Sequence, residues 1–243
     1  RYFSYQIRRL YHYEKIYSHR SDAVMTFSYK DKQLLEKQYG LSGVHVLNPY
    51  FGIEDGIMDG TEYREKKRNT LCFLGQMGRD ENALAAMSLI RLGERLKISG
   101  YSVNIYIVGN NPPPELRQLE SDAVHITGFV EDVDEYVLKS GIAVFPLTLG
   151  AGIKLKVLRS LALGTPVVTT DIGAEGIDEK GSILFLAKTE SEFVQIIVDI
   201  MNMGEKEYCD LCRNGQEYAK TYFGWERSER ILRQLYESEK IGV

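Results

Sequence analysis

Two glycines and two lysines lie close together in residues 149–177, LGAGIKLKVLRSLALGTPVVTTDIGAEGI. Gly150 and Gly152 allow the backbone to turn tightly and to approach a ligand without hindrance from a Cβ atom. The helix predicted to follow offers backbone N–H groups and the positive end of its dipole. Lys154 and Lys156 add cations to its first turn, where they are unfavourable for the helix itself. The combination predicts an anion site, and phosphate fits it best. The alternative is that both lysines point into water.

The chain lacks the two commonest glycine-rich phosphate loops. No G-x-G-x-x-G opens the first helix after a strand, which argues against a nicotinamide cofactor, and no G-K-[ST] of a Walker loop occurs. No D-x-D stands in the loops expected to form the cleft, so a metal ion is not demanded. The D-V-D of residues 132–134 lies at a predicted helix start, which favours capping. We therefore expect no required cofactor and no metal site.

Cys209 and Cys212 form a single C-x-x-C. A structural zinc site needs about four ligands, and no second C-x-x-C or nearby histidine pair supplies the rest. We interpret the two cysteines as thiols on adjacent turns of a helix. Three cysteines in the whole chain also argue against a secreted disulfide scaffold, so a cytoplasmic location is expected.

The loop that carries the lysines must be positioned by the secondary-structure elements around it. Predicted strands and helices alternate regularly along this part of the chain. Strands joined by crossover helices form a parallel sheet with helices on both faces, and the strand-like runs here are nearly continuous in apolar residues, as doubly buried strands are. The prediction is an α/β fold, a doubly wound parallel sheet followed by a helical tail from Thr189. The strands are expected at residues 70–75, 103–109, 124–128, 141–147, 166–170 and 182–187, and the helices between them at residues 80–97, 113–121, 133–140 and 153–164.

Composition and charge exclude some classes of function. The chain has 243 residues and a formal net charge of −4, which argues against a general nucleic-acid binder. No apolar run approaches the ~20 residues of a membrane span. Residues 1–20 read as a basic, tyrosine-rich helix with five Lys/Arg against one acid, so it could make peripheral contact with an anionic membrane at its inner face. The favoured alternative is that this helix packs on a domain outside the chain.

Four loops that follow predicted strands resemble those of one enzyme family, in order and spacing. The segments are FLGQMGRDENALAA, IVGNNPPPEL, ITGFVEDVDEYVLKSGIAVFPL and GAGIKLKVLRSLALGTPVVTTDIGAEGI. They resemble the donor-binding domain of GT-B-fold glycosyltransferases, in the family 4 group of retaining enzymes, over residues 70–177. That family has two Rossmann-like domains facing a cleft, and the second holds the nucleotide-sugar donor.

The resemblance assigns parts to individual residues. Gly75 matches the glycine whose backbone approaches the donor diphosphate, and Phe129 with Val130 matches the segment against the nucleobase. Gly150 and Gly152 match the loop around the donor.

Lys154 and Lys156 match the G-x-G-I-K-L-K of one subgroup. We expect them to act as the catalytic cations that stabilise the departing nucleoside diphosphate, with help from Arg79.

The departures from the family are also specific. Many members carry two glutamates, the second binding the ribose hydroxyls, where this chain has Ala151 and Arg159. A guanidinium cannot accept hydrogen bonds, so Arg159 cannot act as that carboxylate. It either pairs with a neighbouring acid or marks lost or altered donor binding. Gln76 and Glu81 stand where many members have an arginine and a lysine.

The resemblance also predicts the domain organisation. Residues 1–50 are expected to close an N-terminal acceptor domain, residues 51–69 to link it to a donor domain at residues 70–223, and residues 224–243 to form a helix that crosses back. Most of the acceptor domain is then absent, so the chain alone should not transfer sugar.

The leading functional hypothesis is a glycosyltransferase that uses a nucleoside-diphosphate sugar and a polysaccharide or lipid-linked glycan acceptor. The first alternative is a non-catalytic accessory protein that keeps the fold as a binding module. The second is a sugar-nucleotide isomerase such as a 2-epimerase. That chemistry needs several acids and histidines in the cleft, whereas His125 is the one histidine of the donor region.

Overall fold

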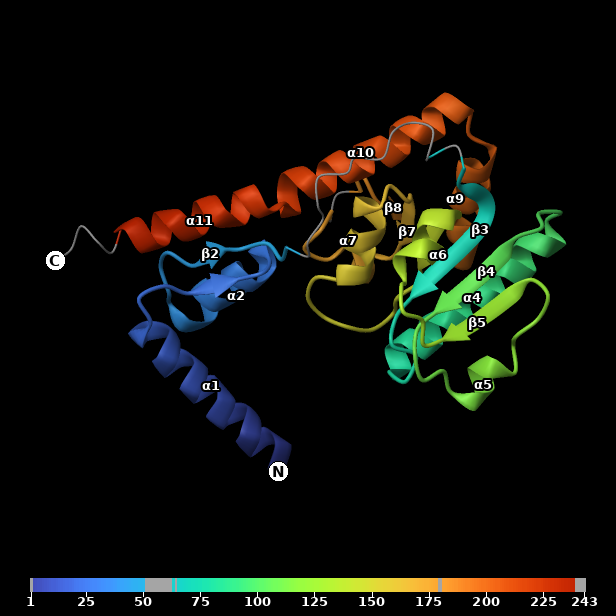
Figure 1. The fold of residues 1–243 in the computed structure, drawn as a ribbon. Helices are drawn as coiled ribbons and strands as arrows, with labels where there is room; N and C mark the ends of the chain where they lie inside the picture. The colour runs from blue at the N-terminus through green and yellow to red at the C-terminus, as the bar shows by residue number, and fades with distance from the viewer. Residues whose placement is uncertain (1, 51–62, 64, 179–180, 239–243) are drawn as a thin grey trace. The chain divides into compact units, whose positions relative to one another are not determined.

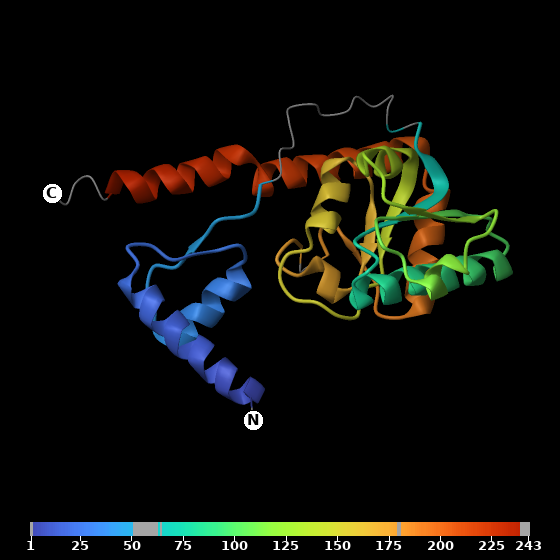
Figure 2. The ribbon, with the colours of Figure 1, turned by 60° about the horizontal axis from the view of Figure 1, so that its bottom comes forward.

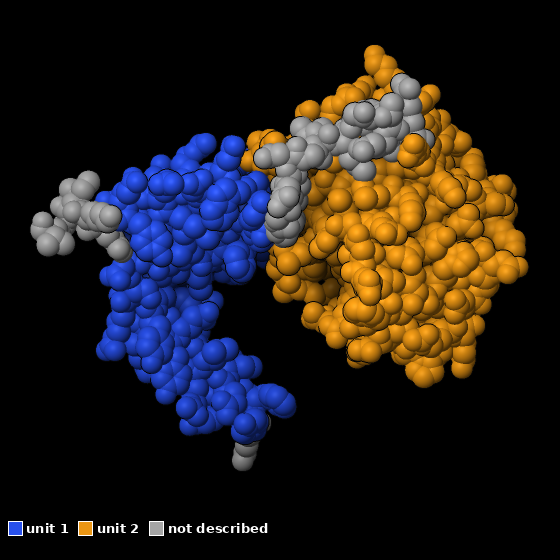
Figure 3. Space-filling view, viewed as in Figure 1, with its two compact units in different colours: residues 1–52, 222–243 blue, residues 53–221 orange. Residues whose placement is uncertain are grey.

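The computed structural model describes residues 2–50, 63, 65–178 and 181–238. The chain divides into two compact units, Arg1–Gly52 with Tyr222–Val243, and Ile53–Thr221 (Figure 3). The predicted linker at residues 51–69 lies largely outside the described residues, although the first strand of the larger unit already begins at Lys67.

The larger unit is built on one parallel sheet of six strands, which confirms the predicted fold class (Figure 1). The strand order is β5-β4-β3-β6-β7-β8, and every neighbouring pair is parallel. Each predicted strand run overlaps one of them. The strands are β3 Lys67–Leu74, β4 Asn104–Val108, β5 Val124–Gly128, β6 Ser140–Phe145, β7 Val167–Thr169 and β8 Phe185–Leu186.

Helices cover both faces of this sheet (Figures 1 and 2). α4 Asp80–Ile98 and α9 Glu190–Asn202 contact each other on one face, and α6 Asp134–Lys139 and α7 Leu155–Ala162 lie on the other. α10 Glu205–Phe223 reaches the sheet where the Tyr208 hydroxyl donates to the Gly141 carbonyl. Two short helices complete the unit, α5 Pro114–Arg117 and α8 Asp171–Ala174. Strand β6 is buried along its whole length, so the core runs through the centre of the sheet.

Two predicted helices differ in extent from those observed. The run at residues 113–121 forms only the four residues of α5, because Ser121 already bridges to Val124 at the start of β5. α7 begins at Leu155 rather than near Ile153, because Gly152 is left-handed (φ 73°) and Lys154 is extended (φ −91°, ψ 92°).

The smaller unit contains α1 Tyr2–Arg20, β1 Met25–Thr26, α2 Tyr29–Tyr39, β2 His45–Val46 and α11 Trp225–Ser238. α2 ends at Gly40, which is left-handed with φ 70°. α1 buries none of its residues, and the Tyr39 hydroxyl of α2 donates to the Glu14 carboxylate of α1 at 2.5 Å. Within the described residues, every helix is too short or too polar to span a membrane.

The cysteines follow the helical interpretation. Cys209 and Cys212 both lie in α10, and both are buried and form no disulfide among the described residues. Burial raises the pKa of the Cys212 thiol to about 11, so it is protonated near neutral pH.

Candidate functional site

The strand order places two loops of interest side by side. β3 lies in the middle of the sheet, with β4 on one side and β6 on the other, so the chain winds outward in both directions from the β3–β6 pair. In such sheets the carboxyl ends of the two strands at this switch point border the ligand crevice. The loop after β3 carries Gly75, and the loop after β6 carries Gly150 and Gly152. The predicted donor loops therefore flank the switch point.

The loop after β3 lies tightly against the loop after β4. The Gly75 amide donates to the Val108 carbonyl at 3.0 Å, and the Met77 amide donates to the Asn110 carbonyl at 2.9 Å. A Cβ atom on Gly109 would lie 1.7 Å from the Gly75 carbonyl oxygen, and Gly109 has φ 147°. Only glycine fits there, so the approach of these loops is fixed by the absence of a side chain.

The first turn of α7 receives no side-chain cap. Its N-cap residue is Lys154, whose ammonium is a donor with no acceptor capacity. By contrast, Ser28 caps α2 and Thr189 caps α9, each by accepting a backbone N–H with its hydroxyl. The Val157 N–H of this turn donates to the Lys154 carbonyl at 2.9 Å, but the N–H groups of Leu155 and Lys156 receive no side-chain cap, and an anion is the acceptor that a helix start favours.

The two lysines do not point into water, so that alternative is wrong. The Lys154 side chain is 12% exposed, and its Nζ lies 3.8 Å from a carboxylate oxygen of Glu175. The same Nζ donates to the Gly152 carbonyl at 2.6 Å, which folds the side chain over its own loop.

The Lys156 side chain extends from α7, which follows β6, to α4, which follows β3 on the other side of the switch point. Its Nζ donates to Asn82 Oδ1 at 2.5 Å and lies 4.6 Å from the centre of the Phe73 ring. The pKa of Lys156 is lowered to about 8, mainly by burial. The Glu81 carboxylate raises this pKa, whereas the charges of Lys154 and Arg79 lower it further. The ammonium is thus held in a poorly solvated place where an anionic ligand would stabilise it.

The remaining predicted residues are more exposed. Arg79 precedes α4 and pairs with Glu81 at 2.7 Å. Phe129, which follows β5, is 77% exposed, and Val130 beside it is half-buried. His125 is half-buried and stacks on Tyr106, with ring centres 4.8 Å apart, in keeping with a structural histidine.

Arg159 has a partner that the sequence alone did not name. Its Nε lies 2.5 Å from Asp134 Oδ1 and its guanidinium donates to Oδ2 at 2.8 Å, a bidentate pair between α7 and the start of α6. This hydrogen bonding raises the pKa of Arg159. The prediction that it pairs with a neighbouring acid is confirmed. Asp134 is the second aspartate of the D-V-D, and its own amide donates to Asp132 Oδ1 at 2.8 Å, although the N-cap position of α6 is Val133 and carries no side-chain cap.

Sequence reasoning missed two residues beside the lysines. Asn82 contacts Lys156 from the first turn of α4, and Glu175 contacts Lys154 from the C-cap of α8, in the connection that follows β7. Glu175 follows the carboxyl end of a strand, which is a signal that could have found it. Asn82 sits inside a helical run, where only an unexpected polar residue on a buried face marks it.

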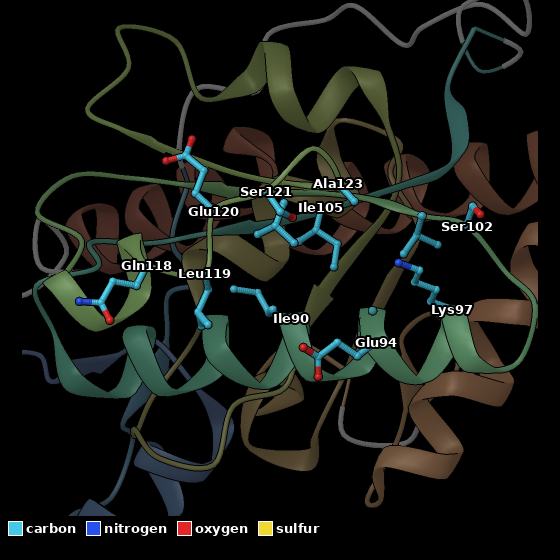
Figure 4. A pocket seen from close by; sticks show the side chains of 13 residues that line it. Ile90, Glu94, Lys97, Ser102, Ile105, Gln118, Leu119, Glu120, Ser121 and Ala123 are labelled. Atoms are coloured by element: carbon cyan, nitrogen blue, oxygen red, sulfur yellow. The ribbon is translucent and has the colours of Figure 1, made fainter.

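A cavity of about 570 Å³ lies elsewhere in the unit, between α4 and the stretch that leads into β5 (Figure 4). Ile90, Ile105 and Leu119 give it apolar walls, and Glu94 and Lys97 also line it. None of the predicted donor residues borders it. Among the described residues, no group of three or more His, Cys, Asp or Glu side chains is arranged to hold a metal ion.

The fold and these loops define a Rossmann-like α/β domain. The family described as "Glycosyl transferases group 1" matches residues 68–203, and the chain belongs to this family. No curated protein matches the chain in sequence.

Solved structures of GT-B glycosyltransferases share the fold. TarM matches with a TM-score of 0.75 and 12% identity over 92% of this chain and 45% of its own. Sucrose-phosphate synthase from Thermosynechococcus elongatus matches with a TM-score of 0.72 and 17% identity, over 95% and 61%. The pneumococcal O-GlcNAc transferase GtfA, solved with UDP and GlcNAc, matches with a TM-score of 0.70 and 14% identity, over 93% and 47%. The chain thus spans about half the length of TarM and of GtfA.

Proposed function

We propose that this chain holds the donor site of a retaining glycosyltransferase, in a group resembling family 4, which transfers a hexosyl-type sugar from a nucleoside diphosphate to a polysaccharide or lipid-linked glycan. The observation that carries the proposal is the pair Lys154 and Lys156 beside an uncapped helix start at the switch point of the sheet. The family match and the UDP bound in similar structures support it. Retention of configuration rests on the family resemblance alone.

The site suits the chemistry of a departing diphosphate. Cleaving the bond between sugar and phosphate builds negative charge on the leaving phosphate oxygens. Preorganised cations and backbone N–H groups stabilise such charge in the transition state, and loss of one such donor costs about 3 kcal/mol in oxyanion-hole precedents. Lys156 belongs to α7, and its ammonium is held by Asn82 of α4 on the other side of the switch point. The ammonium is therefore fixed before the charge develops on the leaving phosphate.

The donor is proposed to sit with its diphosphate at the α7 start and its base towards Phe129 and Val130. Gly75 and Gly109 let the backbone after β3 pack closely on Asn82 and on the loop after β4, which fixes the part of the site that the diphosphate would face. The site needs no cofactor in this proposal, because the lysines and the helix start supply the positive charge. Peripheral contact of α1 with an anionic membrane at its cytoplasmic face is a further part of the proposal, supported by the exposed aromatic residues of this basic helix.

Calorimetric titration of the chain with UDP, GDP and ADP tests the donor site. We expect one of these to bind at a single site, and Lys154→Ala to weaken that binding by about 10- to 100-fold, as the loss of a charge-assisted hydrogen bond does. Lys139→Ala is the matched control, because Lys139 is exposed and pairs with Glu135 on α6. Equal weakening by both substitutions would point to net charge and contradict a local site.

The second candidate is a non-catalytic binding module, and the bidentate pair of Arg159 with Asp134 favours it. Arg159 stands where the family resemblance expects a ribose-binding carboxylate, and its guanidinium is already committed to another element. One similar structure is described as a GtfA/B complex, so assembly of such proteins has a precedent in this fold. No detectable heat with any nucleotide in the panel, from a chain that is folded by circular dichroism, would favour this candidate.

A further inference from the structure

Asn82 ties together three parts of the switch point. It is 7% exposed in the first turn of α4, and its Oδ1 accepts from Lys156 Nζ at 2.5 Å. Its Nδ2 donates to the Gln76 carbonyl in the loop after β3 at 2.9 Å. A Cβ atom on Gly75 would lie 2.9 Å from the Asn82 side chain, so the glycine makes room for the amide. Both ends of the Asn82 amide therefore form hydrogen bonds, one with the loop after β3 and one with Lys156.

The chemical nature of the partner matters as much as its place. A carboxylate at this distance would neutralise the ammonium, whereas the amide of Asn82 satisfies one N–H and leaves the charge uncompensated. Glu81, the carboxylate that raises the pKa of Lys156, is itself paired with Arg79 at 2.7 Å. The aromatic rings of Phe73 and Phe145, centred 4.6 and 5.9 Å from Nζ, attract a cation without cancelling its charge.

We propose that Asn82 is a positioning residue for the diphosphate: its neutral amide fixes the Lys156 ammonium between α7 and the loop after β3 while keeping that charge available to the ligand. The inference rests on the proposed donor function. It assigns Asn82 no contact with the sugar or with the reacting atoms.

This environment of Lys156 predicts how diphosphate binding is coupled to proton uptake. The charged groups that face Lys156 are Glu81, which raises its pKa, and Lys154 and Arg79, which lower it together with burial, to about 8. At pH 8, Lys156 is therefore protonated in about half of the protein molecules that carry no ligand. A bound diphosphate stabilises the charged form, so binding at pH 8 should take up part of a proton.

The test compares the wild-type chain with Asn82→Asp, which keeps the shape and adds a charge. UDP is titrated at pH 8 in two buffers of different ionisation enthalpy, which gives both the affinity and the protons taken up. We expect the wild type to take up about half a proton. For Asn82→Asp we expect at least tenfold weaker binding and no proton uptake, because the new carboxylate neutralises Lys156 and holds it protonated. Asn202→Asp, an exposed change on α9, is the control for net charge and should match the wild type.

Asn82→Ala provides a second, independent arm. It removes the acceptor without adding charge, so it should lower the pKa of Lys156 below that of the wild type while also weakening UDP binding. Opposite movements of this pKa in the two variants, followed by NMR of lysine labelled at Cε, together with weaker binding in both, are not expected from a merely structural residue.

The outcomes separate the two proposals. Absence of UDP binding to the folded wild type overturns this use of UDP as donor, and the inference with it. Binding by the wild type that Asn82→Asp leaves unchanged in affinity and proton uptake overturns the role of Asn82 alone. If Asn82→Asp does not fold, Asn82→Ala decides by the same measurements, and wild-type affinity in it overturns the inference.

Discussion

Lys154 and Lys156 stand two positions apart in the sequence but are held in different ways. Lys154 lies between its own loop carbonyl and the carboxylate of Glu175, so its charge is partly compensated. Lys156 has a neutral partner in Asn82 and aromatic neighbours. Electrostatic stabilisation of a leaving group depends on uncompensated, preorganised charge, so we assign the larger share of that task to Lys156.

The depressed pKa of Lys156 has a consequence for stability. Its value falls from 10.5 to about 8 in the folded chain. Between about pH 8 and 10.5 the unfolded chain holds a proton that the folded chain has released, so folding stability rises with pH in this window. Lys156→Met removes the titrating group. We expect the wild type to gain stability relative to this variant from pH 8 to 9.5, by at most about 1.4 kcal/mol per pH unit.

Urea unfolding of both proteins at several pH values measures that difference. Comparing the change with pH, rather than the stabilities themselves, removes the packing cost of the substitution. A difference between the two proteins that stays constant from pH 7 to 9.5 would mean that Lys156 has its ordinary pKa.

The pair of Arg159 and Asp134 can be tested by exchanging its charges. Their side chains are 46% and 27% exposed, so the pair is partly screened. Arg159→Glu should lower the free energy of unfolding by about 1 kcal/mol, because an attraction is replaced by a repulsion at a partly exposed site. Adding Asp134→Arg should recover most of the loss, as followed by thermal unfolding. Additive losses in the double variant would show that the two residues do not interact.

How far the sequence predicts individual residues depends on how local their interactions are. The lysines were found because glycines, cations and a helix start are neighbours in the chain. Asn82 and Glu175, the partners of the lysines, and Asp134, the partner of Arg159, could not be paired from the sequence, because each comes from a different strand–helix connection. Such pairings are set by the strand order, which the pattern of apolar residues does not encode.

Among the elements, long buried strands and capped helices were predicted well. β3 to β6 overlap the predicted runs, although β3 begins earlier at the polar Lys67, and α9 begins one residue after the predicted Thr189, whose hydroxyl accepts from the Glu192 amide. β8 is only Phe185–Leu186, shorter than its apolar run, because it pairs with β7 at just two positions on the edge of the sheet. The length of a strand therefore depends on its pairing with neighbouring strands, and the local sequence does not encode that pairing.

The contact between the loops after β3 and β4 gives a prediction for these elements. Gly109→Ala should destabilise the protein severely, by more than about 3 kcal/mol, because the new Cβ atom would lie 1.7 Å from the Gly75 carbonyl oxygen and because φ is 147°. Gly204→Ala is the matched control, since a Cβ atom there meets nothing within 4 Å. Chemical unfolding compares the two. A Gly109→Ala protein as stable as the control would contradict the close loop packing.

At the scale of the whole molecule, the division into two units bears on activity. The larger unit carries the whole sheet and every predicted donor residue, and the smaller one carries α1, α2 and α11. Because TarM and GtfA, which share the fold, are about twice as long as this chain, we propose that donor binding belongs to the chain and that sugar transfer needs further parts.

The central claim is that the α7 start and the lysines beside it hold a diphosphate. A crystal structure of the chain with the nucleoside diphosphate that binds in calorimetry tests it most directly. We expect phosphate oxygens within hydrogen-bonding distance of Lys156 Nζ and of the backbone N–H groups that open α7. A nucleotide bound elsewhere, for example in the cavity between α4 and β5, with both ammonium groups out of reach of its phosphates, would contradict the claim.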